Sequence, residues 1–225
     1  MGRHSVYREV LRVNPARVAS CRSHVIQHGP GRVLVRQENP PSAIYTVRKG
    51  WLYRYRNLGN GRQQIISFII PGDMITFSSV FNPDTPLFYG IKSATHVELC
   101  SFDCGSFRQG IAADPAFTGP YRRALSGYLD TLHRRIADIG QRSARGRMAQ
   151  LLMEFHERHL DRGLVTGSGF DFPISQELLA RALGLTKAYV NRTLSAFKDE
   201  GLIQLRDRQL RIPNPVRLRD LAESE

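Results

Sequence analysis

The segment from residue 174 to residue 212 constrains the fold more than any other part of the chain; it runs ISQELLARALGLTKAYVNRTLSAFKDEGLIQLRDRQLRI. Its periodicity predicts two short helices that meet at Gly184, where the chain must turn sharply and a β-carbon would be costly if φ is positive. Ala180 is small where the two helices would cross, and Val190 falls on the buried side of the second helix. These spacings of four and six residues predict a tightly packed helical pair.

Capping residues and a hairpin complete this segment. Ser175 is placed to cap the first helix, and Thr186 is placed to cap the second. GLIQLR, the turn pair Asp207 and Arg208, and QLRI then predict a small β-hairpin. Helix, turn, helix and hairpin is the outline of a winged helix-turn-helix. A helical hairpin inside an ordinary core is the alternative, and the basic hairpin that follows argues against it.

The second helix of this pair carries a polar face opposite its apolar side. If this helix enters a DNA major groove, its N-terminal face contacts the bases. Arg192 and Lys187 match guanine O6 and N7, and Asn191 suits an adenine edge or a phosphate. Exposed side chains of these types usually only solvate a helix, and it is their grouping that favours base contact. The predicted DNA-contacting residues, which include phosphate contacts at the caps and on the hairpin, are Ser175, Gln176, Thr186, Lys187, Ala188, Tyr189, Asn191, Arg192, Ser195, Arg206, Arg208 and Arg211.

Length and charge set broader limits. At 225 residues the chain is long enough for two domains, each with its own core. The net charge of +12 and the pI near 10.2 predict attraction to a polyanion, either nucleic acid or an anionic membrane surface. Residues 1 to 140 hold 18 Lys/Arg and 9 Asp/Glu (net +9), whereas residues 141 to 225 hold 14 and 11 (net +3). A DNA-binding site in the second part must therefore be a local patch.

Residues 21 to 105 alternate short apolar runs with turn residues. RVLVRQ, IYTVRKGWLYRYR, QQIISFII and HVELCSF are separated by segments such as ENPP, NLGNG and PGD. This pattern predicts antiparallel strands joined by tight turns. Large apolar and basic side chains alternate in KGWLYRYR, which predicts one packed face and one solvated face. The expected fold class is α+β, with an antiparallel, jelly-roll-like β-roll over residues 1–112.

The pattern changes near residue 113, where a long helix over residues 113–142 is expected. Its charged residues fall outside a narrow heptad-type stripe with spacings of 4, 3, 4 and 3. Such a stripe predicts the pairing of two chains, and a helix that lies on its own β domain is the alternative. A shorter helix over 147–160 opens the expected winged helix-turn-helix domain of residues 143–225. The predicted dimerisation residues are Leu125, Leu129, Leu132, Ile136 and Ile139.

Together these segments resemble the Crp/Fnr superfamily of bacterial transcription regulators over nearly the whole chain. IISFIIPGDMITFSSVF resembles the end of the family's cyclic-nucleotide-binding-type β-roll, YRRALSGYLDTLHRRIADIGQRSARGRMAQLLMEF its dimerisation helix, and the segment from residue 174 to residue 212 its DNA-binding domain. The resemblance implies a homodimer on a palindromic promoter site, and we expect RNA polymerase as a further partner. Many relatives carry a glutamate where Ala188 stands. Because alanine can at most touch a thymine methyl, we expect a different half-site.

The predicted effector pocket departs from the family pattern. Relatives that bind cyclic AMP have a Gly-Glu pair shortly after PGD and an Arg-Ser pair further on; the corresponding places here are Thr76 and Phe77, then Leu87 and Phe88. A buried phosphate without its arginine would be very costly, so cyclic AMP in the usual mode is not expected. Nearby aromatic residues are expected to fill the pocket rather than line one for an apolar effector: Phe77, Phe81, Phe88 and Tyr89.

No cofactor is predicted. Oxygen-sensing relatives hold an iron-sulfur cluster on an N-terminal group of cysteines, and this chain has only Cys21 there. Cys100 and Cys104 would lie about 13 Å apart in an extended strand, too far for a disulfide. We expect them to be packing residues, with a redox role as the alternative. A haem-responsive sensor regulator is a further alternative, because some relatives bind haem, although the spacing of the three candidate ligands does not demand it: His24, His28 and His96.

A cupin-like metal enzyme with an accessory helical domain is the alternative from another functional class. It would need several histidines and a carboxylate that converge from neighbouring strands, and residues 60 to 105 offer only His96 with Glu98 beside it. No apolar run has the roughly 18 to 20 residues of a membrane span, and the N-terminus shows no secretory signal. We therefore expect a cytoplasmic DNA-binding transcription regulator without enzymatic activity.

Overall fold

The chain divides into two compact units, with the division near residue 130. None of the helices in the described part of the chain is long and apolar enough to cross a bilayer. The structure is a computed structural model that describes residues 23–59, 61–76, 82, 84–113, 118–119, 122, 125–126, 128–129, 132–133, 136, 142–167 and 169–224. The domain boundaries expected after residues 112 and 142 remain predictions.

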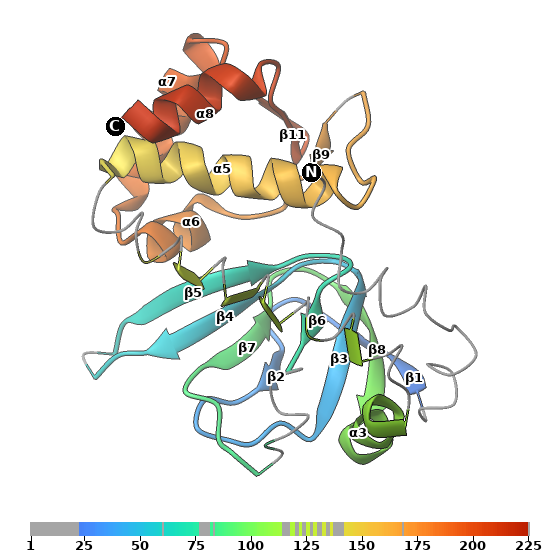
Figure 1. The fold of residues 1–225 in the computed structure, drawn as a ribbon. Helices are drawn as coiled ribbons and strands as arrows, with labels where there is room; N and C mark the ends of the chain where they lie inside the picture. Colours follow the sequence, from blue (N-terminus) through green and yellow to red (C-terminus); the bar gives the residue numbers. More distant parts are fainter. Residues whose placement is uncertain are drawn as a thin grey trace. The chain divides into compact units, whose positions relative to one another are not determined.

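The N-terminal unit is a β-roll of two four-stranded antiparallel sheets (Figure 1), which confirms the predicted architecture. One sheet has the strand order β1-β8-β3-β6 and the other β2-β7-β4-β5. Helix α3 (Cys104–Ala113) follows β8 directly. The strands are β1 (Ser23–His28), β2 (Val33–Val35), β3 (Ala43–Lys49), β4 (Leu52–Asn57), β5 (Gln63–Ile69), β6 (Met74–Ile75), β7 (Gly90–Ser93) and β8 (Val97–Asp103).

The core of the β-roll is built from both sheets. Val47 and Leu99 come from the first sheet, and Leu52, Ile69 and Ile91 come from the second. All five are at most 1% exposed. Since alternate residues of a strand point to opposite faces, each strand places its apolar set in this shared interior.

The turns between these strands follow the predicted signals. In NLGNG the backbone N–H of Leu58 donates to the carbonyl of Arg62 at 2.8 Å, and Gly61 has a φ of 75°. In PGD the Asp73 carboxylate accepts from the backbone N–H of Ile70 at 2.9 Å. These short local bonds close the β4–β5 and β5–β6 turns.

Strand β4 differs from the prediction for KGWLYRYR. Leu52 to Tyr55 are all buried. The prediction that the basic side chains of this segment face solvent is therefore wrong for Arg54, which is only 6% exposed. β4 lies between β7 and β5, and its register against β5 shifts between Arg54 and Tyr55. A bulge of this kind re-aims side chains and interrupts strict alternation.

The predicted stripe helix is partly described. Its described residues between 118 and 136 are helical. Within one chain Leu125 and Leu132 are half-buried, whereas Leu129 is 47% exposed and Ile136 is 70% exposed. Ile139 lies outside the described residues.

The C-terminal unit contains four helices in its described residues and a small three-stranded sheet of order β10-β11-β9. Helix α5 packs on α8, and α6 packs on α7. The final helix, α8, is absent from the sequence prediction. The elements are α5 (Ala144–Leu160), β9 (Phe170–Asp171), α6 (Gln176–Leu183), α7 (Lys187–Asp199), β10 (Gln204–Arg206), β11 (Gln209–Arg211) and α8 (Pro215–Ser224). This confirms the predicted winged helix-turn-helix.

Two glycines of the β-roll offer a matched test of steric crowding. Gly50 and Gly61 have φ values of 80° and 75°, so alanine is strained at both. A β-carbon at Gly61 meets nothing within 4 Å, whereas at Gly50 it would collide with the carbonyl of His96. We expect Gly61→Ala to cost about 1 kcal/mol of unfolding free energy and Gly50→Ala at least about 2 kcal/mol more, measured by urea denaturation. Equal losses of unfolding free energy in the two variants would show that the β3–β4 turn has room for a β-carbon at Gly50.

Candidate nucleic-acid interface

The junction between α6 and α7 is fixed by local hydrogen bonds. The Ser175 hydroxyl accepts from the N–H of Leu178 at 3.2 Å, and the Thr186 hydroxyl accepts from the N–H of Tyr189 at 3.2 Å. Gly184 adopts a left-handed conformation (φ 67°, ψ 32°), and its N–H donates to the carbonyl of Ala180. The predicted caps and the glycine turn are confirmed, and they set the angle at which α7 leaves α6.

One side of α7 is buried against the rest of the unit. Val190 and Phe197 are 0% exposed, and Leu194 is 3% exposed. Leu179 and Ala180 of α6 are buried as well, at 0% and 4%. This apolar contact confirms the predicted inner side of the helix and directs its opposite side to the surface.

The opposite side of α7 is a polar, exposed surface. Its members are spaced so that they share one helical face, which begins at the N-terminal end of α7 where the helix dipole is positive. Tyr189 is half-buried, and the guanidinium of Arg192 lies 5.9 Å from its ring centroid. Ser175 and Thr186 are exposed at the neighbouring helix starts, and Gln176 is half-buried. Over the first three turns of α7 this exposed face consists of Lys187, Ala188, Asn191, Arg192 and Ser195, and Lys198 and Asp199 are exposed in the last turn.

The hairpin after α7 presents arginines at a tight turn. Asp207 and Arg208 have φ values of 47° and 60°, the pair of left-handed conformations that a type I′ turn requires. The carbonyl of Arg208 accepts from the N–H of Phe172 at 2.6 Å, which ties the turn to the strand region of β9. Arg206, Arg208 and Arg211 are all exposed. The predicted turn pair is confirmed, and the geometry leaves the three guanidinium groups at the surface.

An acidic residue accompanies the hairpin. Burial raises the pKa of the Asp171 carboxyl above its usual value, and the nearby charge of Arg208 acts in the opposite direction. Arg208 therefore has a carboxylate neighbour within its own sheet. The positive charge of the hairpin is smaller than its arginine content alone indicates.

Long-range contacts that sequence patterns do not reveal hold the C-terminal end of α7. The Arg145 guanidinium on α5 donates to both carboxylate oxygens of Glu200, at 2.8 Å and 2.6 Å, and lies 5.0 Å from the Phe197 ring centroid. Arg217 on α8 donates to the carbonyl of Glu200 at 3.2 Å. Two other helices thus position α7 from its far end.

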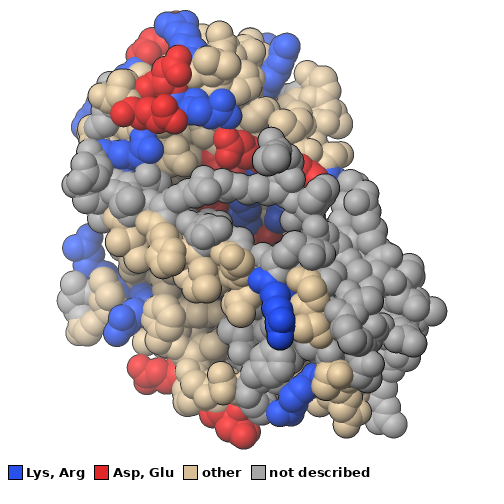
Figure 2. Space-filling view, in the orientation of Figure 1, with Lys and Arg blue, Asp and Glu red and all other residues tan. Residues whose placement is uncertain are grey.

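Basic and acidic side chains are interspersed over this unit in the view of Figure 2. This mixture agrees with the small net charge of the second part of the sequence. The candidate interface is therefore defined by the exposed face of α7 and the hairpin rather than by a broad basic field.

The three described residues predicted for the effector pocket, Thr76, Leu87 and Phe88, do not form a common polar site. The hydroxyl of Thr76 donates to the carbonyl of Ala43 at 2.7 Å, and the residue is 1% exposed. Leu87 is half-buried and packs against the core. Phe88 is 60% exposed, so the expectation that it fills the pocket is wrong, whereas Tyr89 is buried. Phe77 and Phe81 lie outside the described residues.

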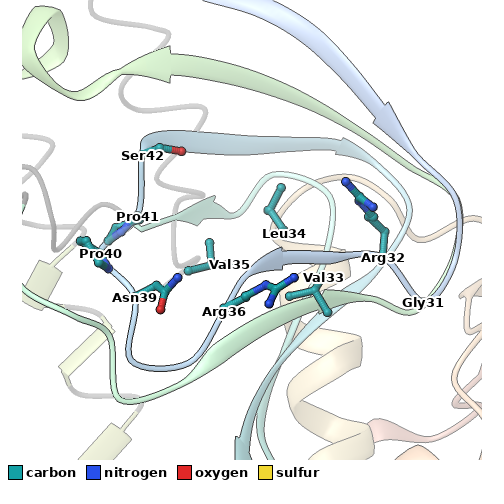
Figure 3. A pocket seen from close by; sticks show the side chains of 10 residues that line it. All are labelled: Gly31, Arg32, Val33, Leu34, Val35, Arg36, Asn39, Pro40, Pro41 and Ser42. Atoms are coloured by element: carbon teal, nitrogen blue, oxygen red, sulfur yellow. The ribbon is translucent and has the colours of Figure 1, made fainter.

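A separate pocket of about 500 Å³ opens beside β2. Figure 3 shows that its lining residues come from the turn before β2, from β2 itself and from the segment that leads to β3. None of the described residues predicted for the effector pocket lines it. The lining residues are Gly31, Arg32, Val33, Leu34, Val35, Arg36, Asn39, Pro40, Pro41 and Ser42.

Two of the three cysteines lie among the described residues. Cys100 and Cys104 are both free thiols, and burial is the main reason why the pKa of Cys104 is raised. Within the described ranges, no three His, Cys, Asp or Glu side chains gather as metal ligands would. Cys21 lies outside those ranges.

Two family models together match most of the chain. The model of the cyclic nucleotide-binding domain matches residues 25–114, and the model of the Crp-like helix-turn-helix domain matches residues 146–221. The second match covers all but the first two residues of α5, all of α6, α7 and the hairpin, and most of α8.

Curated relatives match over most of their length. The nitrogen fixation regulation protein FixK of Rhizobium meliloti is 29% identical over 95% of this chain and 93% of its own. The CRP-like cAMP-activated global transcriptional regulator of Mycobacterium tuberculosis is 24% identical over 92% of each chain.

Solved structures show the same fold. FixK2 from Bradyrhizobium japonicum superposes with a TM-score of 0.77 at 22% identity, over 88% of this chain and 96% of that one. A CooA mutant from Carboxydothermus hydrogenoformans gives a TM-score of 0.70 at 18% identity, over 99% and 97%. With both domain models matched in order on a β-roll and a winged helix-turn-helix, the chain belongs to the Crp/Fnr superfamily of bacterial transcription regulators.

Proposed function

We propose that the protein is a homodimer that binds a palindromic promoter site, with α7 of each chain in a major groove and the hairpin on the adjacent backbone. The exposed polar face of α7 carries this proposal, because it offers arginine, lysine and asparagine donors above a fully buried apolar side. Two half-sites one helical turn apart, roughly 34 Å, suit such a dimer. RNA polymerase is the proposed second protein partner at the promoter. The working compartment is then the cytoplasm, where bacterial DNA lies.

The exposed stripe supports the dimer. Leu129 and Ile136 present large apolar side chains to solvent in the single chain. They are seven residues apart on a helix, which is the repeat of a two-helix seam. Pairing with a second copy would remove both from water, and this favours a dimer over a helix that serves only its own β-roll.

The proposed mode of control does not use cyclic AMP in the usual way. Leucine and phenylalanine stand at the places where cyclic-AMP-binding relatives have arginine and serine, and the Thr76 hydroxyl is engaged with the backbone. An anionic phosphate there would lack its cationic partner. We further propose that the protein works without a resident haem or an Fnr-type iron-sulfur cluster, and that it is a regulator rather than an enzyme, as its relatives are.

Selection of bound sequences from a random DNA pool tests the proposal directly. The expected product is an inverted repeat with half-sites one helical turn apart. Ala188 predicts that one position lacks the cytosine preference that a glutamate would give. A product without symmetry, or no enrichment over bulk DNA, would overturn the proposal.

Arg192→Ala tests base contact by α7. We expect loss of discrimination at one G·C pair, a cost of about 1 to 3 kcal/mol, with weak salt-dependent binding retained, as measured by fluorescence anisotropy on selected and scrambled duplexes. Lys198→Ala, exposed in the last turn of the same helix, is the matched control and should change neither affinity by more than about twofold. Equal losses on both duplexes would make Arg192 a phosphate contact instead.

Leu129→Lys tests the dimer. A charge placed in the stripe should shift the protein from dimer to monomer in analytical ultracentrifugation and weaken binding to the full palindrome by about tenfold or more. Ser126→Lys, exposed one residue beyond Leu125 on the same helix, should leave the dimer intact. If Leu129→Lys remains a dimer, the stripe does not form the dimer interface, and the alternative, that this helix packs on the β domain of its own chain, is favoured.

Asp171→Asn tests the hairpin. Removal of the carboxylate beside Arg208 should tighten binding to selected and scrambled DNA alike by about two- to fivefold, because phosphate contacts carry no sequence information. Asp199→Asn, at the C-terminal end of α7, is the matched control. If Asp171→Asn binds both duplexes with unchanged affinity, Arg208 does not contact the phosphates.

A further inference from the structure

Arg54 is a buried cation in the β-roll. It lies on β4 and is 6% exposed. Its Nη1 donates to the hydroxyl of Ser67 on β5 at 3.1 Å, while its Nε is buried without a hydrogen bond. Among the described residues no carboxylate forms an ion pair with it. A buried charge is strongly disfavoured unless other groups compensate for the lost water, so its presence needs an explanation.

Two tyrosine rings supply that compensation. The guanidinium carbon of Arg54 lies 5.6 Å from the ring centroid of Tyr89 and 5.5 Å from that of Tyr128. Both distances are within the range in which a cation is attracted to a ring face, and the attraction grows when the pair is removed from water. Tyr89 immediately precedes β7, whereas Tyr128 belongs to the helix that carries the dimer stripe. One side chain therefore joins two neighbouring strands, the segment before β7 and this helix.

The position of Tyr128 on its helix gives this contact a consequence for the stripe. Tyr128 follows Leu125 by three residues and precedes Leu132 by four, so the three side chains are neighbours on the helix surface. Fixing the Tyr128 ring on Arg54 therefore fixes the rotation of the helix about its axis. That rotation determines the direction in which exposed Leu129, the next residue, points.

An apolar side chain would satisfy this interior at lower cost if filling were its only requirement, because apolar replacements of buried charges are often neutral or stabilising. A guanidinium instead supplies a direction-dependent link between separate segments. We propose that Arg54 is an internal cation that fixes the stripe helix on the β-roll, so that specific DNA binding needs no added small-molecule effector. The inference rests on the proposed function, since it concerns how that DNA binding is controlled.

Four variants and a control test this link. Arg54→Met keeps the stem and removes the charge, Arg54→Lys keeps a charge, Tyr128→Leu removes the ring and Tyr128→Phe keeps it. Arg56→Met is the matched control, because Arg56 is an exposed arginine on the same strand. Circular dichroism and thermal unfolding identify any variant that does not fold, and Tyr128→Leu, at a half-buried position, keeps the test decisive if Arg54→Met is one of them.

Binding of the selected palindrome without any ligand is the first readout. Wild type, Arg56→Met and Tyr128→Phe should bind alike, whereas Arg54→Met and Tyr128→Leu should bind about tenfold more weakly, with Arg54→Lys in between. Cyclic AMP and cyclic di-GMP, added separately, should leave the wild-type affinity unchanged. Wild-type affinity in Arg54→Met, or a tenfold gain of the wild type with either nucleotide, would overturn the inference.

Hydrogen exchange gives a second readout that needs no DNA. The backbone amides of residues 122–136 should exchange about tenfold faster in Arg54→Met and Tyr128→Leu than in wild type and Arg56→Met. Unchanged exchange would overturn the link. If exchange responds as expected but the wild type binds no specific sequence, the link stands and the proposed function fails, so the two failures are distinguishable.

Discussion

The burial of one side of α7 is the constraint on which the candidate interface depends. Val190, Leu194 and Phe197 remove the apolar side from water, and only then does the polar side acquire a fixed direction. The caps at Ser175 and Thr186 and the turn at Gly184 determine where the helix begins and how it leaves α6. The chemistry of the exposed face thus follows from packing on the opposite side.

In the proposed DNA complex, the hairpin and α7 contribute different kinds of contact. Side chains at the start of α7 can present paired donors, which is what discrimination between base pairs requires. The exposed arginines of the hairpin suit the regular backbone, where charge matters more than geometry. Because the Asp171 carboxylate lies near Arg208, we expect simple charge attraction at the hairpin to be limited and fitted contacts to contribute more to the proposed binding.

Local patterns predicted the parts of the fold whose determinants are close in sequence. The caps, the Gly184 turn, the Asp207–Arg208 turn and the apolar periodicity of α7 each depend on residues within one or two turns of chain, and each was predicted. Helix α8 was missed because its two buried residues, Leu218 and Ala222, are too few to form a recognisable apolar stripe.

Contacts between distant segments could not be predicted in this way. Arg145 and Glu200 are 55 residues apart, and the burial of Arg54 depends on a register shift and on rings from two other segments. From the sequence alone, Arg54 and Arg145 cannot be distinguished from ordinary surface arginines. The base-contact roles of Lys187, Asn191 and Arg192 stay predictions, since exposure on one face of a helix does not show that a side chain contacts a base.

The contacts of Arg145 and Arg217 with Glu200 restrict the motion of α7 relative to the other helices of its unit. Arg145 from the first turn of α5 and Arg217 from α8 converge on the residue that ends α7, while the Gly184 turn holds the other end. Rocking α7 alone would break hydrogen bonds at both ends. Motion of α7 is therefore coupled to that of α5, α6 and α8, and in the proposed DNA complex we expect any adjustment to a wider or narrower site to displace these helices together.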